Sequence, residues 1–131
     1  YWSVDSPDKV TANWCVQKVR EYINNNISGA WVREIGSQTA NIYSYEYRIA
    51  FRMDLTPAHG GSGTIGPTDG YYLNSYHFVM QTSNGGWAHK RNEEKASENL
   101  GFVNPDSAYL CWQDLSQTAV TPTIYFAAQV W

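Results

Sequence analysis

The first 26 residues contain the pattern of an amphipathic helix. Within the segment 6–26, SPDKVTANWCVQKVREYINNN, apolar residues recur at intervals of three and four, at Ala12, Val16, Val19 and Ile23. This spacing puts them on one side of a helix. The run of asparagines at 24–26 marks the end of the helix.

Two starting points for this helix are open. Ser6, followed by a proline, is a good N-cap, because its side-chain oxygen accepts an unpaired amide and proline already has a helical φ. Asn13 could cap a later start instead. The first start leaves Cys15 in the middle of the helix, and the second leaves it in the first helical turn.

The segment 39–55 alternates between apolar and polar residues, as a half-buried strand does. The apolar row is Tyr43, Tyr45, Tyr47, Ile49, Phe51, Met53 and Leu55. Ile42, Tyr45, Ile49 and Met53 also fall at helical spacing. Because the alternation is the more regular pattern, we interpret the segment as a strand over at least part of its length. The three tyrosines continue the apolar row without interruption, so they are predicted to be buried rather than to form a platform for sugar rings.

Further strands are predicted towards the C-terminus. The segment 56–70 is rich in Gly, Pro, Ser and Thr, which is typical of a loop, and it contains His59. Residues 76–82 and 87–91 flank the sequence SNGG and predict a β-hairpin, because Asn-Gly between apolar runs favours tight turns. The aromatic and β-branched residues of 122–131 predict another strand. One early helix and several later strands predict an α+β fold, with the N-terminal helix packed on a mainly antiparallel sheet.

Composition narrows the class of protein. The 131 residues suit one small domain, residues 1–131. Charged residues make up 16% of the chain, against roughly 25% in an average globular protein, and aromatic residues make up 15%. The chain begins at Tyr1 rather than methionine, as a secreted protein does after losing its signal peptide, although a trimmed domain would look the same. We therefore expect a secreted protein.

Charge and hydropathy argue against several partners. The net charge is −3 and the basic residues are scattered, whereas a nucleic-acid backbone needs a dense basic surface. No apolar run approaches the roughly 20 residues that cross a bilayer. His77 and His89 have no third ligand at a recognised spacing, so no metal site is expected, and no other cofactor is implied.

The two cysteines leave two alternatives. Cys15 and Cys111 can form one disulfide, which is the ordinary expectation in an exported domain, or remain two free thiols. With the disulfide, the chain would be a secreted binding module that recognises a glycan or a protein surface through aromatic residues. With free thiols, Cys15 becomes a candidate nucleophile.

The turn of the hairpin decides whether His77 and His89 lie together. Strand residues two apart share a face of the sheet. A two-residue loop, 84–85, would put the histidines on opposite faces. A three-residue loop, 84–86, would pair Gln81 with His89 and put both histidines on one face. The second glycine of the turn favours this alternative.

Two histidines on one face could serve a catalytic cysteine. An imidazole takes the proton of the thiol, and a further polar group orients the imidazole. Cys15, His77 and His89 follow one another in an order that resembles bacterial papain-like hydrolases of the NlpC cell-wall peptidase type. In that family a cysteine begins a helix, a histidine opens a strand and a polar residue, often a second histidine, follows on the next strand. The segment YHFVMQTSNGGWAHK also resembles a YHFxxQxxDGxWxHK segment of some secreted bacterial proteins.

This resemblance implies a catalytic site and an activity. Cys15 would be the nucleophile, His77 the general base and His89 the residue that orients His77. The implied activity is hydrolysis of amide bonds, by a peptidoglycan-type peptidase or amidase or by a toxin-like peptidase or deamidase. The implied substrate is a peptide, a peptidoglycan or another glycan.

The resemblance also suggests residues for substrate binding. The oxyanion would be held by the backbone amide of Cys15 together with Asn13, Trp14 or Trp2. Trp14, Asn13 and Trp87 would contact the substrate.

Overall fold

A computed structural model of the chain describes residues 11–26, 28–57, 71–89, 98–113, 115 and 120–129. Within these ranges it contains one α-helix, α1 (Ala12–Asn26), and a short 3-10 helix, η2 (Tyr109–Cys111). The strands are β1 (Trp31–Ile35), β2 (Tyr47–Pro57), β3 (Tyr71–Gln81), β4 (Trp87–His89), β5 (Glu98–Gly101) and β6 (Ile124–Gln129). The predicted α+β class agrees with this helix and sheet. His59 and most of the expected loop lie outside the described residues.

Helix α1 starts at neither of the two expected caps. Thr11 is its N-cap: the Thr11 hydroxyl oxygen accepts the amide of Trp14 at 3.1 Å, and the Thr11 carbonyl accepts the amide of Cys15 at 3.0 Å. Asn13 therefore lies inside the helix, and Ser6 lies outside the described residues. Cys15 is in the first helical turn.

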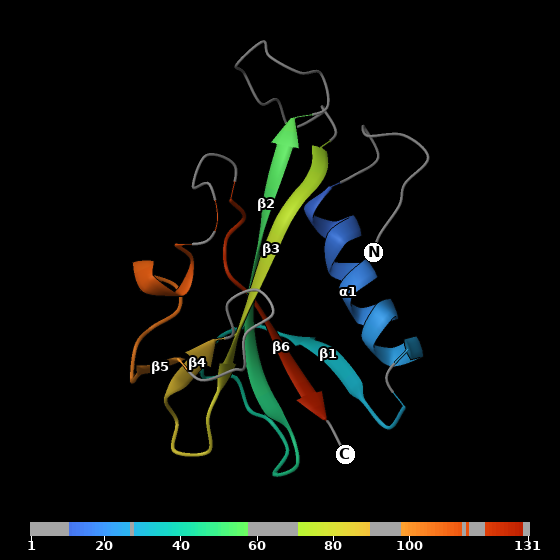
Figure 1. Cartoon of the computed structure of the whole chain (residues 1–131). Helices are drawn as coiled ribbons and strands as arrows, with labels where there is room; N and C mark the ends of the chain where they lie inside the picture. Colours follow the sequence, from blue (N-terminus) through green and yellow to red (C-terminus); the bar gives the residue numbers. More distant parts are fainter. Residues whose placement is uncertain are drawn as a thin grey trace.

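The strands form one antiparallel sheet in the order β1-β6-β2-β3-β4-β5 (Figure 1). The C-terminal strand β6 thus lies between the first two strands of the sequence. The long strands β2 and β3 form the centre and pair Phe51 with Phe78 and Arg52 with His77. A β-bulge interrupts their register between Asp54 and Leu55.

Helix α1 covers one face of the sheet, which we call the helix face. Its buried cluster is apolar and consists of Cys15, Val16, Val19, Val32, Ile49, Phe51, Met53, Leu55, Phe126 and Ala128. The predicted helical stripe is confirmed for Val16, Val19 and Ile23, which lie in or against this cluster, while the side chain of Ala12 is outside the described part. In the strands these residues alternate with residues that point to the other side, as a side-chain period of two requires.

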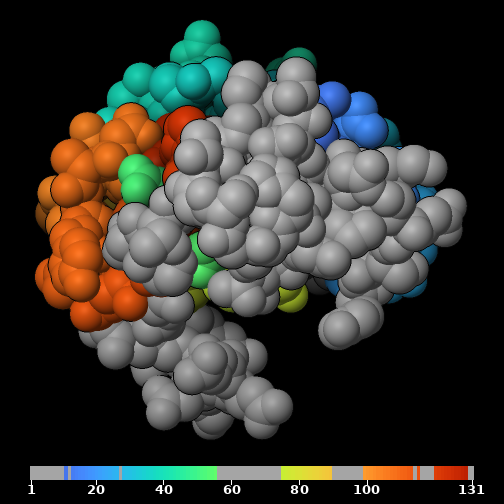
Figure 2. Space-filling view, turned by 90° about the horizontal axis from the view of Figure 1, so that it is seen from above, coloured from blue at the N-terminus to red at the C-terminus, as the bar shows by residue number. Residues whose placement is uncertain are grey.

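Irregular segments cover the opposite face, which we call the loop face. Its buried cluster is Ile35, Ala50, Val79, Trp87, Cys111, Trp112, Leu115, Tyr125 and Ala127. Ala40 and Ile42 from the β1–β2 connection pack on it, and so do Val103 and Ala108 from the segment after β5. Viewed from above, this last segment and α1 lie on opposite sides of the molecule (Figure 2).

The tyrosine row is only partly what the pattern predicted. Strand β2 begins at Tyr47, and its inward residues from Ile49 onwards are buried on the helix face. Tyr43 and Tyr45 precede the strand in a turn closed by the amide of Glu46 on the Tyr43 carbonyl, at 2.9 Å. Their side chains are 61% and 53% exposed, and Tyr47 is exposed too. The prediction of buried tyrosines is therefore wrong, because the alternation continues beyond the part of the sheet that α1 covers.

The two cysteines are not paired. Cys15 and Cys111 are both free and buried. Cys15 belongs to the helix face and Cys111 to the loop face, so the sheet lies between them. The alternative of a Cys15–Cys111 disulfide is therefore wrong. Among the described residues, no helix has the length and apolar character needed to cross a membrane.

Candidate functional site

The β3–β4 hairpin puts both histidines on the loop face. Val79 pairs with His89 and Gln81 with Trp87. The amide of Thr82 donates to the carbonyl of Gly86 at 2.7 Å, so the loop is 83–85. The expected pairing of Gln81 with His89 is displaced by two residues. A shift of two keeps the face unchanged, and this is why the two histidines still lie together.

The tight loop depends on its first glycine. Gly85 has φ +90°, a conformation that side-chain-bearing residues rarely adopt, and its amide donates to the Thr82 carbonyl at 3.0 Å. The Asn84 side chain accepts the amide of Gly86 at 3.1 Å. These bonds fix the hairpin register and with it the relative position of the histidines.

The two imidazoles are hydrogen-bonded to each other. His77 Nε2 and His89 Nδ1 are 2.9 Å apart, and the rings meet edge to face at 85° with centroids 5.0 Å apart. His77 is 7% exposed and His89 is 2% exposed. Such a bond needs one protonated and one unprotonated nitrogen, so the two rings cannot both be cationic while it is kept. One ring is therefore the donor and the other the acceptor, and the tautomer decides which ring donates.

An aromatic residue links the histidine pair to the segment that covers it. The ring of Trp112 meets the ring of His77 at 88°, with centroids 6.2 Å apart, and its indole N–H donates to the Pro105 carbonyl at 2.7 Å. The guanidinium of Arg52 lies 4.9 Å from the centroid of a Trp112 ring. Arg52 is also the cross-strand partner of His77. A fixed positive charge thus lies beside the histidines on the same face of the sheet.

Arg52 also anchors the covering segment. Its guanidinium donates to the Asp106 carbonyl and to the Thr123 hydroxyl, each at 2.8 Å. The hydroxyl of Tyr125 donates to the Asp106 carboxylate at 2.7 Å. Burial and the neighbouring Asp106 raise the pKa of Tyr125, so its hydroxyl remains a donor over the whole physiological range.

Cys111 is the thiol on the histidine side of the sheet. It directly precedes Trp112 and is almost fully buried. Burial raises the pKa of Cys111 to about 11, and the positive charge of Arg52 opposes that rise. The sequence gives no indication of this position, because the histidines and Cys111 are distant along the chain and no spacing motif connects them.

Cys15, the predicted nucleophile, lies on the other side of the sheet. It is fully buried among apolar side chains of α1, β2 and β6. Burial raises the pKa of Cys15 to about 11, so the thiol is protonated at neutral pH although it lies in the first helical turn. The structure brings His77 and His89 together and does not bring Cys15 to them.

The predicted substrate-binding residues do not converge on one place. Asn13 is exposed and Trp14 half-buried, both on α1, whereas Trp87 is buried on the loop face. Trp2 lies outside the described residues.

The loop face also contains a buried acid, Asp54, that was not among the candidate residues. Asp54 is 2% exposed and accepts a hydrogen bond of 3.4 Å from Ser75, which is two residues before His77 on β3. The polar positions of β2 contained the signal for it: Arg52 and Asp54 alternate with the apolar row, and so they share the side opposite Phe51. The described residues contain no group of three or more side chains suited to hold a metal ion.

No family model matches this chain, and no match was found among the curated proteins or the solved structures. The resemblance to the NlpC-type hydrolases stays a prediction that rests on the order of the cysteine and histidines.

Proposed function

We propose that this chain is a secreted, cysteine-dependent hydrolase of amide bonds, with His77 as general base and His89 as the residue that orients it. The hydrogen bond of 2.9 Å between His77 Nε2 and His89 Nδ1 is the observation that carries the proposal. The substrates we propose are those of a peptidoglycan-type peptidase or amidase, or of a toxin-like peptidase or deamidase.

One of the two possible tautomers of the pair fits this division of roles. When His77 Nε2 donates its proton to His89 Nδ1, the neutral His77 ring has its basic lone pair on Nδ1. His77 Nδ1 is then the atom that accepts a proton from the nucleophile and later returns it to the leaving amine. His89 fixes the ring orientation and stabilises the imidazolium that forms.

The shared face favours Cys111 over Cys15 as the nucleophile. The Cys111 thiol gives its proton to His77, and the thiolate attacks the carbonyl carbon of the amide. The imidazolium protonates the departing amine as the C–N bond breaks, which leaves a thioester. His77 then takes a proton from water, the resulting nucleophile releases the acid, and the proton returns to the Cys111 sulfur. Arg52 supplies positive charge near the developing anions.

Both groups are buried, so turnover requires the covering segment around Trp112 to move away from the histidines. The hydrogen bonds that Arg52 and Tyr125 donate to Asp106 hold this segment to the sheet, so they would have to open when it moves.

The test compares matched variants on two substrates. Purified peptidoglycan is assayed for newly released amino groups, and a glutamine-rich protein is assayed for released ammonia. We expect C111A and H77A to lower the rate by about 10²–10⁴-fold or more, as expected for loss of a nucleophile or general base. H89A should lower it less, and H89Q, which keeps a hydrogen-bonding side chain, should recover part of the loss.

The matched control is C15A, which removes the other thiol and should keep the rate. A purely structural histidine pair predicts the opposite pattern, in which H77A lowers the melting temperature and leaves the rate per folded molecule unchanged. That result, or full activity of C111A, would refute the proposal.

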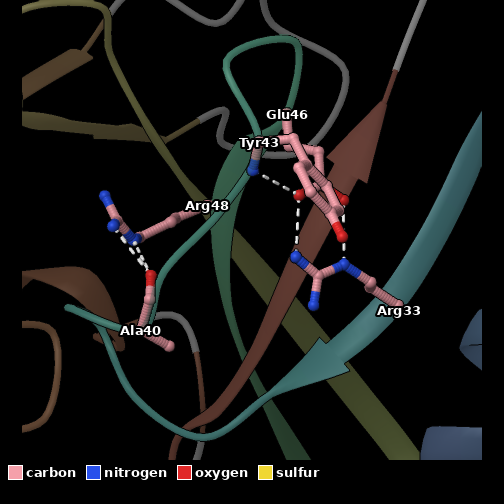
Figure 3. A network of polar contacts seen from close by, with 5 residues as sticks. All are labelled: Arg33, Ala40, Tyr43, Glu46 and Arg48. Atoms are coloured by element: carbon pink, nitrogen blue, oxygen red, sulfur yellow. Dashed lines mark hydrogen bonds and ion pairs between the residues drawn. The ribbon is translucent and has the colours of Figure 1, made fainter.

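Recognition through aromatic side chains is a second candidate, now without a disulfide. Tyr43 and Tyr45 stack at 5.5 Å and 10°, and the Arg33 guanidinium lies 5.4 Å from the Tyr43 ring centroid. Glu46 holds this exposed stack in place, because it binds both the Arg33 guanidinium and the Tyr43 amide (Figure 3). Y45A should reduce co-sedimentation with purified peptidoglycan or another target, whereas C111A should not.

A further inference from the structure

A groove lies at the edge of the molecule where α1 meets the start of β1. Its volume is about 350 Å³, and its lining residues are Gln17, Arg20, Glu21, Asn24, Asn25 and Trp31. This volume is near the lower end of small-molecule sites, which span roughly 300–1,000 Å³. None of the lining residues belongs to the histidine site, which lies on the loop face of the central strands.

Trp31 gives this groove one flat apolar surface. Its side chain is 55% exposed, although indole is among the largest apolar groups that a protein can bury. Trp31 belongs to β1, which lies at the edge of the sheet and pairs with β6 among the described strands. An exposed indole beside polar side chains is suited to a ligand that has both an apolar face and polar edges.

The backbone beside Trp31 is held in position by α1. The Asn24 side chain accepts the Val32 amide at 2.8 Å and donates to the Val32 carbonyl at 3.4 Å. These two bonds connect the end of the helix to the edge strand in the way a neighbouring strand would. Trp31 is therefore presented on a fixed backbone, which lowers the entropic cost of binding.

The remaining lining residues supply both donors and acceptors without net charge. Arg20 carries a positive charge and Glu21 a negative one, while Gln17 and Asn25 supply neutral amides that donate and accept. The nearby Lys18 pairs with Glu21 at 3.3 Å. An anionic ligand would meet Glu21 and a cationic one would meet Arg20. The chemistry therefore favours an uncharged ligand rich in hydroxyl groups.

We infer that this groove binds a saccharide, with one pyranose ring packed on the Trp31 indole and its hydroxyl groups bonded to the polar rim. A pyranose presents C–H groups on one face and hydroxyls at its edge, which matches the two kinds of surface in the groove. The volume accommodates one or two sugar rings. This site does not depend on the chemistry of the histidine pair.

The experiment uses the full chain and a panel of neutral oligosaccharides: cellotriose, maltotriose, mannotriose and tri-N-acetylchitotriose. Binding is measured by calorimetry and by the shift of the Trp31 indole N–H signal in ¹H–¹⁵N spectra. We expect at least one of them to bind at millimolar or lower concentration and to shift that signal. W31A should weaken binding at least tenfold, while W31F, which keeps an aromatic face, should recover most of it.

Two controls keep this result separate from the proposed hydrolase. Y109A removes an exposed aromatic ring from η2, which packs on the opposite side of the sheet, and should leave saccharide binding unchanged. H77A should also leave it unchanged, even if it abolishes hydrolysis. The inference is overturned if no oligosaccharide shifts the Trp31 signal, or if W31A binds as well as the wild type. It is also overturned if W31A leaves saccharide binding unchanged and alters only the self-association of the protein, measured by sedimentation. The groove would then be an interface between copies of the chain.

Discussion

The two faces of one sheet are built in different ways. The helix face buries a continuous apolar cluster under α1, with Phe51 in contact with Phe78 and Phe126. The loop face also has an apolar centre, but the buried polar residues Asp54, His77 and His89 lie on it. Burying polar groups is costly unless they are hydrogen-bonded, so the loop face depends on directional bonds where the helix face depends on packing.

Two arginines of β2 show how the loop face is closed. Arg48 donates to the Ala40 carbonyl at 2.8 and 3.1 Å and so holds the β1–β2 connection (Figure 3). It also donates to the Gln81 side chain at 2.9 Å. Arg52 holds the segment that contains Asp106. Each arginine uses its planar donors to bind a main-chain carbonyl of a covering segment. The main apolar packing thus lies on the helix face, and the candidate chemistry lies on the loop face.

The largest expected effect is on the helix face. Phe51→Ala removes a fully buried ring from contact with three other rings and should lower the free energy of unfolding by about 3–5 kcal/mol. Phe51→Leu keeps most of the apolar volume and should cost clearly less. Both are measured by urea denaturation monitored by circular dichroism. A loss of less than 1 kcal/mol for Phe51→Ala would contradict the role of this cluster as the main source of stability.

The same substitution on each face provides a second, smaller test. Cys15→Ser puts a hydroxyl among apolar side chains and should lower the free energy of unfolding by about 1–3 kcal/mol. Cys111→Ser should cost less, because the loop face also buries polar groups, whereas Cys15 is surrounded by apolar side chains. Cys15→Ala and Cys111→Ala control for the change in volume. Equal costs for the two serine variants would remove the contrast between the faces.

Much of the fold follows from local patterns. Val16, Val19 and Ile23 lie on the side of α1 that packs on the sheet. The apolar residues that alternate from Ile49 onwards lie on the helix face of β2. The Asn-Gly turn predicts the hairpin correctly, although its loop begins one residue earlier than expected. The register is displaced by two residues, and an even displacement keeps each side chain on its face, so both histidines still lie on the predicted face.

The candidate site depends on long-range pairing that no local pattern contains. Which side of the sheet receives α1 decides that Cys15 and His77 are separated, and the insertion of β6 between β1 and β2 is invisible in the sequence. The exposure of Tyr43 and Tyr45 has the same origin, because alternation shows which residues share a face and not where the covering helix ends.

The reactivity of the two thiols extends the comparison to chemistry. The pKa of each thiol is about 11, so iodoacetamide labelling of the native protein should be slow at pH 7. The rate should rise about tenfold per pH unit until the pH approaches the pKa. Since the pKa of Cys111 already includes the effect of Arg52, neither thiol should label far ahead of the other in the folded protein.

Peptide mass mapping separates the two sites, and labelling in urea gives the rate of the exposed thiols as a control. Rapid labelling of Cys15 near pH 6 would contradict the prediction. It would mean that the thiol is activated on the helix face, and the nucleophile of the proposed hydrolase would then have to be sought there.

The smallest expected effect concerns the ion pair beside the tyrosine stack. The bonds from Arg33 and from the Tyr43 amide hold the pKa of Glu46 below its usual value. Since the pKa of Glu46 is lower in the folded state than in the unfolded state, the stabilisation is complete above the unfolded-state pKa and is lost as the pH falls through the folded-state pKa.

Arg33 is 36% exposed, so solvent screens the pair, and Glu46→Gln should cost only about 1 kcal/mol at pH 7. The difference in melting temperature between Glu46→Gln and the wild type should therefore be largest at neutral pH and shrink below about pH 4. Glu21→Gln, which removes an exposed carboxylate that contacts Lys18 at 3.3 Å, should show almost no difference at either pH, and an equal response of the two variants would mean that Glu46 is no better held than a surface acid.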